Sequence, residues 1–121
     1  MAATVTNITT SDLAARMERG DELLLVNTLP TESFDEEHIP GSVSVPNATP
    51  RFAEEISSRV GNKDTPVVVY CTSRECETSQ RAARKLAEAG FTNVLHYADG
   101  ITGWKLAGYD VESAQPSRPR R

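Results

Sequence analysis

The chain is poor in cysteine, in aromatic residues and in positive charge, and it contains no long apolar run. Of its 121 residues only 2 are cysteine and 6% are aromatic, and the formal net charge is −4. This acidic balance argues against nucleic acid as a partner, because a nucleic-acid interface requires a basic face. No apolar run approaches the ~20 residues that span a bilayer, so we expect no membrane insertion. Two cysteines favour chemistry or simple packing over a structural disulfide.

The N-terminal residues also lack the features of a targeting signal. Residues 1–12 are polar and rich in threonine, with no apolar h-region, so we expect no secretory signal and a cytoplasmic location. The remaining composition, 38% hydrophobic and 25% charged, is that of one soluble domain. We assign this domain to residues 1–112 and expect a disordered tail over residues 113–121, where prolines and arginines occur without an apolar pattern.

Short apolar runs alternate with helical periodicities along the domain. The sequence predicts strands at residues 23–26, 42–45, 67–70 and 93–97, and the third is the clearest because three valines follow one another. Helices are predicted between them, at residues 9–20, 30–38, 49–61, 78–90 and 101–106. This alternation is typical of an α/β protein with a parallel sheet covered by helices on both faces.

Three of the predicted helices carry a recognisable start. Residues 9–12 have the pattern of a capping box, and Thr49 followed by Pro50 has the pattern of a cap and a proline at the first helical position. Thr78 or Ser79 is expected to cap the helix that follows the first cysteine.

Cys71 is the strongest candidate for a functional residue. It comes directly after the clearest strand and before a loop and a helix start, and parallel sheets bind ligands at the carboxyl ends of their strands. The N–H groups of such a loop and the dipole of the following helix favour an anion. We therefore expect a lowered pKa for the Cys71 thiol and a nucleophilic thiolate, in preference to a cysteine that only fills space.

Three segments resemble motifs of the single-domain rhodaneses. Residues 38–42 resemble the family's His-Ile-Pro-Gly-Ala box, residues 68–71 resemble the strand that delivers its catalytic cysteine, and residues 100–104 resemble its Gly-Gly-x-x-x-Trp segment. The resemblance implies a rhodanese-like three-layer fold with a central, mostly parallel sheet of about five strands. It also implies a sulfurtransferase without a cofactor, in which Cys71 carries a sulfane sulfur as a persulfide and passes it to a thiol or another nucleophile.

The resemblance further implies that the backbone N–H groups of the loop stabilise the anionic sulfur. The expected anion-binding loop consists of Thr72, Ser73, Arg74, Glu75, Cys76 and Glu77. The partners would be a small sulfur donor and a thiol acceptor, either a small molecule or a protein. Because Arg74, the only cation of the loop, is followed by Glu75 and Glu77, we expect a dianionic donor such as thiosulfate to be disfavoured.

The sequence departs from the family pattern at several positions. Asn27 and Leu29 stand where the family usually has the Asp and Arg of an Asp-x-Arg motif, which we interpret as variation of the scaffold. Asp99 stands where a first glycine is usual. The loop also carries a second cysteine, Cys76, as in a subset of the family. Cys76 is either a resolving thiol or second sulfur carrier that reacts with Cys71, or a loop residue that contributes only its backbone.

The two histidines, His38 and His96, are expected to be structural. Their spacing relative to the cysteines matches no zinc pattern, so we expect no metal site. Two other functions remain open. A cysteine-based phosphatase or arsenate reductase would need an arginine six residues after the cysteine, where this chain has Glu77. A non-catalytic regulatory or adaptor domain is the alternative outside enzymology.

Overall fold

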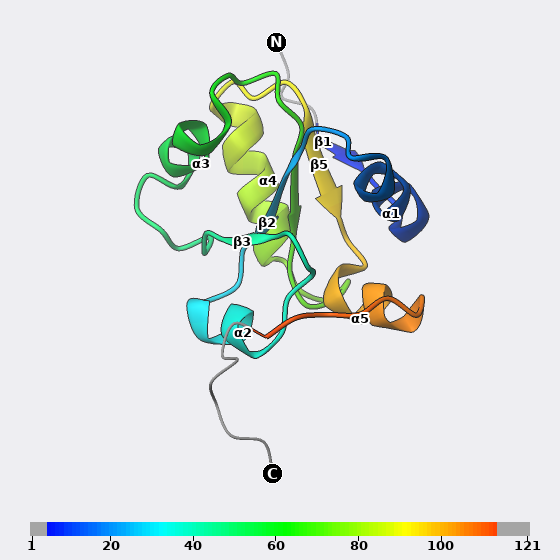
Figure 1. The fold of residues 1–121 in the computed structure, drawn as a ribbon. Helices are drawn as coiled ribbons and strands as arrows, with labels where there is room; N and C mark the ends of the chain where they lie inside the picture. The colour runs from blue at the N-terminus through cyan, green and yellow to red at the C-terminus, as the bar shows by residue number, and fades with distance from the viewer. Residues whose placement is uncertain (1–4, 114–121) are drawn as a thin grey trace.

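The computed structural model describes residues 5–113, and its centre is a sheet that lies between two layers of helices (Figure 1). All neighbouring strands are parallel, in the order β1-β5-β4-β2-β3. The strands are β1 (Val5–Asn7), β2 (Leu24–Asn27), β3 (Val43–Ser44), β4 (Val67–Tyr70) and β5 (Val94–Tyr97). The predicted α/β fold, with a parallel sheet of five strands, is therefore confirmed.

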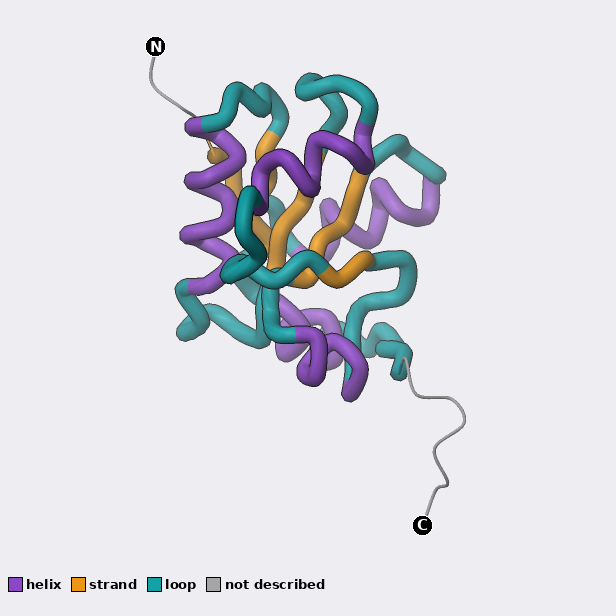
Figure 2. Tube along the Cα trace, turned by 90° about the vertical axis from the view of Figure 1, so that its left-hand side faces the viewer, coloured by secondary structure: helices purple, strands orange, loops and turns teal. Residues whose placement is uncertain are grey.

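The helices divide between the two faces of the sheet (Figure 2). One face packs against α1 (Thr10–Arg19) and α5 (Gly100–Leu106), and the other against α3 (Phe52–Val60) and α4 (Thr78–Glu88). The short α2 (Thr31–Glu36) follows β2 beyond the sheet. None of the helices between residues 5 and 113 is long and apolar enough to traverse a lipid bilayer.

Strand β4 is the centre of both hydrophobic cores. All four of its side chains are buried, and they alternate between the two faces. Val68 and Tyr70 belong to the core beneath α1 and α5, whereas Val67 and Val69 belong to the core beneath α3 and α4. A strand covered on both faces is expected to be apolar at every position, which explains the continuous run that made β4 easy to predict.

Strand β1 was not predicted from the sequence. Its three residues are exposed, and they pair with β5 in the register Val5↔Val94 at the edge of the sheet. An edge strand of this kind is held by backbone hydrogen bonds and lacks the apolar pattern that identifies a buried strand.

Two predicted helix starts were wrong, and one was right. Thr9 caps α1 as expected, since its hydroxyl accepts a hydrogen bond from the Asp12 N–H at 3.1 Å. Helix α3 begins at Phe52 and not at residue 49, because Arg51 occupies the N-cap position with a left-handed φ of 56°. Helix α4 has Glu77 at its N-cap, and neither Thr78 nor Ser79 caps it.

The C-terminal segment returns to the turn that follows α2. His38 and Glu112 form an antiparallel bridge with two backbone hydrogen bonds of 2.9 and 2.8 Å. The Ser113 hydroxyl donates to the carbonyl oxygen of Asp35 at 3.1 Å. Ser113, the first residue of the expected disordered tail, is thus bound to the domain. The remainder of that expected tail, residues 114–121, lies outside the described residues.

The buried hydroxyl of Tyr70 joins β4 to two other segments. It accepts hydrogen bonds from the Asn27 side-chain amide at 3.2 Å and from the Ile39 N–H at 3.0 Å. It also lies 2.8 Å from the Ser42 hydroxyl, which itself donates to the Ile39 carbonyl at 2.7 Å, so Tyr70 is the donor to Ser42. Burial raises the pKa of Tyr70 above its usual value, so the hydroxyl stays protonated and can donate.

Replacement of Tyr70 by phenylalanine should destabilise the domain. The change leaves the buried donors of Asn27 and Ile39 without an acceptor, which costs about 1–3 kcal/mol in the free energy of unfolding. Urea titration followed by circular dichroism measures this. The control is Tyr109→Phe, at a half-exposed ring stacked on Trp104, which should change stability by no more than about 0.5 kcal/mol. Equal stability of the two variants would contradict the assigned role of the Tyr70 hydroxyl.

Candidate active site

Cys71 begins the loop at the carboxyl end of β4, as predicted, and it is only 1% exposed. Its position is fixed through the backbone on both sides. The carbonyl oxygen of Tyr70 accepts hydrogen bonds from the N–H and the hydroxyl of Thr28, both at 3.1 Å. The carbonyl oxygens of Cys71 and Thr72 accept from the N–H groups of Ile101 and Thr102, at 3.1 and 2.9 Å.

Gly100 allows the start of α5 to approach the loop this closely. It has a φ of 63°, and a Cβ atom built on it would overlap the carbonyl oxygen of Cys71 and lie 2.7 Å from that of Thr72. Only glycine fits this position without a shift of the backbone. The glycine of the Gly-x-x-x-Trp segment therefore serves the cysteine loop directly, while Trp104 is a buried core residue whose indole N–H donates to the Asp110 carbonyl at 2.9 Å.

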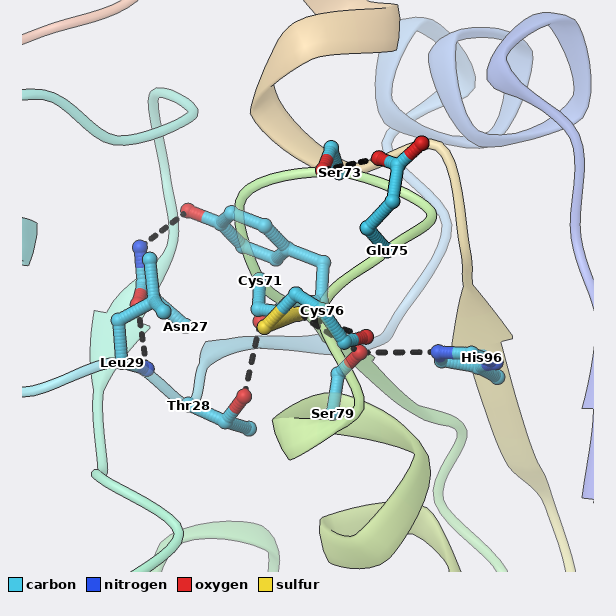
Figure 3. The surroundings of a disulfide bond; sticks show 10 residues. Asn27, Thr28, Leu29, Cys71, Ser73, Glu75, Cys76, Ser79 and His96 are labelled. Carbon is cyan, nitrogen blue, oxygen red and sulfur yellow. Dashed lines mark hydrogen bonds between the residues drawn. A yellow bond between two sulfur atoms is a disulfide. The ribbon is translucent and has the colours of Figure 1, made fainter.

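The two cysteines are joined by a disulfide in this structure (Figure 3). Their Cα atoms lie 6.4 Å apart, and the Cys76 N–H donates to the Ser73 carbonyl at 3.1 Å, so the loop turns back on itself. The Sγ of Cys71 also lies 3.4 Å from the carbonyl oxygen of Cys76. Cys76 is more exposed than Cys71 and covers it. The spacing of the two cysteines is therefore compatible with a reaction between them.

Sequence reasoning missed two residues near the reactive sulfur. The hydroxyl of Ser79, in the first turn of α4, lies 3.3 Å from the Cys71 Sγ and 2.9 Å from Nε2 of His96 on β5. Burial lowers the pKa of His96 below its usual value. Ser79 was expected as a possible helix cap and His96 as a structural residue. No local sequence pattern links the two residues, because they meet through the packing of α4 against β5.

The polar side chains of the loop mostly bind one another or their neighbours. Arg74 forms an ion pair of 2.7 Å with Asp99, the residue that replaces the usual glycine. The Ser73 hydroxyl donates to Glu75 at 2.9 Å, and Glu77 pairs with Arg81 at 3.2 Å. A groove of about 540 Å³ lies beside this part of the loop and is lined by Thr10, Ser73, Arg74, Glu75, Asp99, Thr102, Gly103, Leu106 and Ala107.

The remaining candidates have structural contacts. His38 is buried, with its ring stacked on Phe34 and its Nδ1 2.8 Å from the Phe34 carbonyl oxygen. Asn27 is buried as well and also accepts a hydrogen bond from the Leu29 N–H at 2.9 Å, which agrees with its interpretation as part of the scaffold. Within residues 5–113, no three His, Cys, Asp or Glu side chains gather in a way that could hold a metal ion.

The comparisons with known proteins agree with this geometry. The structure is an α/β domain with a parallel sheet and a cysteine loop after its central strand. Residues 9–107 match the family model described as the rhodanese-like domain. The chain belongs to the rhodanese-like domain family, as its sequence motifs indicated.

Several curated relatives carry a similar sequence. The chain is 34% identical over 109 residues to an HTH-type transcriptional regulator of Mycobacterium tuberculosis, an alignment that covers 90% of this chain and 46% of the regulator. The chain therefore spans about half the length of that relative. It is 31% identical to thiosulfate sulfurtransferase 16 of Arabidopsis thaliana, over 68% of this chain and 73% of the relative. Thiosulfate sulfurtransferase GlpE of Coxiella burnetii is 30% identical, in an alignment that covers 69% of this chain and 73% of the relative.

Solved structures share the fold. A Bacillus halodurans protein superposes with a TM-score of 0.80 at 24% identity, over 95% of this chain and 82% of the other. A thiosulfate sulfurtransferase of Pseudomonas aeruginosa superposes with a TM-score of 0.77 at 22% identity, over 92% of this chain and 21% of the other. At this level of identity the likeness concerns the fold alone.

Proposed function

We propose that this domain is a sulfurtransferase that carries a sulfane sulfur as a persulfide on Cys71. The observation that carries the proposal is the placement of Cys71 at the end of the central strand, with the backbone on both sides held by Thr28 and by the start of α5. Two relatives at 30% identity or more bear the name thiosulfate sulfurtransferase, which supports the same chemistry.

The proposed cycle consists of two displacements at sulfur. The Cys71 thiolate attacks the outer sulfur of the donor, a new S–S bond forms, and the old bond breaks with its electron pair leaving on sulfite or on a thiolate. An acceptor thiolate then attacks the outer sulfur of the persulfide, and the electron pair of that bond returns to Cys71. The backbone N–H groups of residues 72–75 and 77 and the N-terminus of α4 would stabilise the anionic sulfur between the two steps.

The disulfide must open before this cycle can begin. A reducing thiolate would attack Cys76, the more exposed sulfur, form a mixed disulfide there and release the Cys71 thiolate; a second thiol would then free Cys76. Such reductants are abundant in the cytoplasm, where we place the activity. The disulfide would form again from the persulfide. The Cys76 thiolate would attack the inner sulfur of the Cys71 persulfide and release hydrosulfide, which makes Cys76 a resolving thiol.

The charges around the loop favour a donor with little negative charge. Arg74 is the only cation of the loop, and its charge is largely compensated by Asp99 at 2.7 Å. Glu75 adds negative charge on the exposed side of the loop, while Glu77 is paired with Arg81. We therefore propose a polysulfide or another persulfide as the preferred donor and a small thiol or a protein thiol as the acceptor.

The alternative is a regulatory domain that does not turn over substrate. The relative with 34% identity is named as a transcriptional regulator, and this observation favours the alternative. The two functions differ in turnover with a donor and an acceptor. A phosphatase remains disfavoured, because the position that needs an arginine holds Glu77, which is paired with Arg81.

Replacement of Cys71 by serine should abolish sulfur transfer. Without the thiolate the persulfide cannot form, so turnover of a polysulfide with cyanide as acceptor should fall by at least about a thousandfold. Mass spectrometry after incubation with polysulfide should show addition of one sulfur to the native protein, and Cys71→Ser should show none at this site. Circular dichroism confirms that the fold is retained. Full turnover by the serine variant would refute the assignment, and absence of turnover in the native protein would favour the regulatory alternative.

Removal of the ion-pair partner of Arg74 should lower the KM for thiosulfate. In Asp99→Asn the guanidinium loses its counter-charge, so the KM for thiosulfate should fall by roughly threefold to tenfold, more at low ionic strength, with little change in kcat. Glu77→Lys should act in the same direction. The control is Glu54→Gln on α3, which removes an equal charge on the other face of the sheet. Efficient thiosulfate turnover by the native protein would contradict the proposed donor.

Removal of Cys76 separates the resolving role from a purely structural one. Cys76→Ser should keep its transferase activity, hold the Cys71 persulfide longer when acceptor is absent, and lose activity faster in peroxide, because no second thiol can intercept the oxidised sulfur. Persulfide lifetime is followed by mass spectrometry. If the variant matches the native protein in persulfide lifetime and in peroxide sensitivity, Cys76 contributes only its backbone to the loop.

A further inference from the structure

A continuous hydrogen-bonded path runs from the Cys71 sulfur through Ser79 on α4 to His96 on β5. Figure 3 shows Ser79 between the disulfide and His96, with the histidine side chain directed toward the hydroxyl. The distances are 3.3 Å from Cys71 Sγ to Ser79 Oγ and 2.9 Å from Ser79 Oγ to His96 Nε2. Ser79 is only 1% exposed. A buried hydroxyl that bridges a sulfur and an imidazole is well placed to pass a proton between them.

The far end of this path reaches solvent. His96 lies on the face of β5 that turns toward α4, because Val94, two residues earlier, packs into the core beneath that helix. His96 is half-buried and lines a surface groove of about 280 Å³ together with Val5, Asn7, Gln80, Arg84 and Ala87. The cysteine loop borders a different groove, to which α5 contributes Thr102, Gly103 and Leu106.

We propose that Ser79 and His96 form a proton relay that deprotonates Cys71 and releases the proton into the groove beside α4. His96 acts through Ser79 and is therefore a positioning residue, whereas the Ser79 hydroxyl touches the reacting sulfur. The relay deepens the proposed sulfur transfer, since it supplies the thiolate on which that function rests.

Each proton that moves along the relay has a defined donor and acceptor. In the thiol state the Cys71 S–H donates to Ser79 Oγ, the Ser79 O–H donates to His96 Nε2, and the imidazole carries its proton on Nδ1. When the Cys71 proton moves to Ser79 Oγ, the Ser79 proton moves to Nε2, and the Nδ1 proton leaves to water in the groove. The thiolate then accepts from Ser79, and Ser79 accepts from the Nε2–H. The imidazole is neutral before and after, and only its tautomer has changed.

The charges around His96 favour release of the proton over its storage. Among the residues that line its groove, Arg84 from α4 is the only other one with a charge, while β1 contributes Val5 and Asn7. On β4 the register partner of His96 is the apolar Val69. Burial disfavours an imidazolium, in agreement with the lowered pKa of His96. The histidine therefore passes the proton on.

The first test measures the acidity of the Cys71 thiol in the reduced Cys76→Ser protein, where Cys71 is the only thiol. The rate of iodoacetamide alkylation against pH gives its midpoint. Adding Ser79→Ala or His96→Phe should raise this midpoint by about one pH unit, the effect of losing one hydrogen bond to a charged group. The control is Gln80→Ala, at an exposed neighbour in the same groove, which should leave the midpoint unchanged.

Each other outcome overturns the relay. If both variants titrate like the control, neither residue supports the thiolate. If only Ser79→Ala shifts the midpoint, the hydroxyl acts alone and the role of His96 is wrong. No sulfur donor or acceptor is present, so this result is independent of whether the protein transfers sulfur.

The second test needs no change at Ser79 or His96. Nitrogen-15 spectra of the His96 ring in the reduced Cys76→Ser protein should show the neutral tautomer switch from Nδ1–H to Nε2–H as Cys71 ionises. In the Cys71→Ala, Cys76→Ser protein the tautomer should stay constant over the same pH range. A tautomer that does not change while Cys71 titrates would overturn the relay, even if both variants of the first test were poorly folded.

Discussion

The position of the reactive cysteine depends on three consecutive carbonyl groups, those of Tyr70, Cys71 and Thr72. Each accepts a hydrogen bond from a distant segment: the first from Thr28 after β2, and the other two from the start of α5. Since the side chain of Tyr70 also binds Asn27 and the turn at Ile39, nearly every element around the carboxyl end of the sheet is tied to this short stretch. The backbone of Cys71 is thus held in place by contacts that do not involve its sulfur, which is bonded to Cys76 in this structure.

The same segments also set the electrostatic character of the site. The start of α5 brings two N–H groups to the loop carbonyls and, one residue earlier, places Asp99 against Arg74. The replacement of a glycine by an aspartate thus has a physical consequence at a distance of 25 residues in sequence, because it compensates the only cation of the loop. The loop therefore offers little uncompensated positive charge to a dianion.

The sequence was sufficient for the fold and for the position of Cys71 at the end of β4, because buried parallel strands leave strong local patterns. It was insufficient where backbone pairing or tertiary contact decides the structure. The edge strand β1 has no apolar pattern, and Arg51 adopts a left-handed conformation that moves the start of α3 past the apparent Thr-Pro signal. Ser79 resembles a helix cap, yet its hydroxyl binds Cys71 and His96. Ser79 and His96, 17 positions apart in the sequence, meet there because α4 packs against β5.

The two bonded cysteines differ in burial, so the two ends of the disulfide differ in their access to external thiols. Cys71 is almost fully enclosed, while Cys76 is reachable from solvent. External thiols therefore meet only the Cys76 sulfur of the bond, so a covalent adduct with a cellular thiol such as glutathione would accumulate on Cys76 and leave Cys71 unmodified. The chain can then exist as a third, capped species besides the dithiol and the disulfide, and the proportion of the three would report the thiol balance of the surroundings.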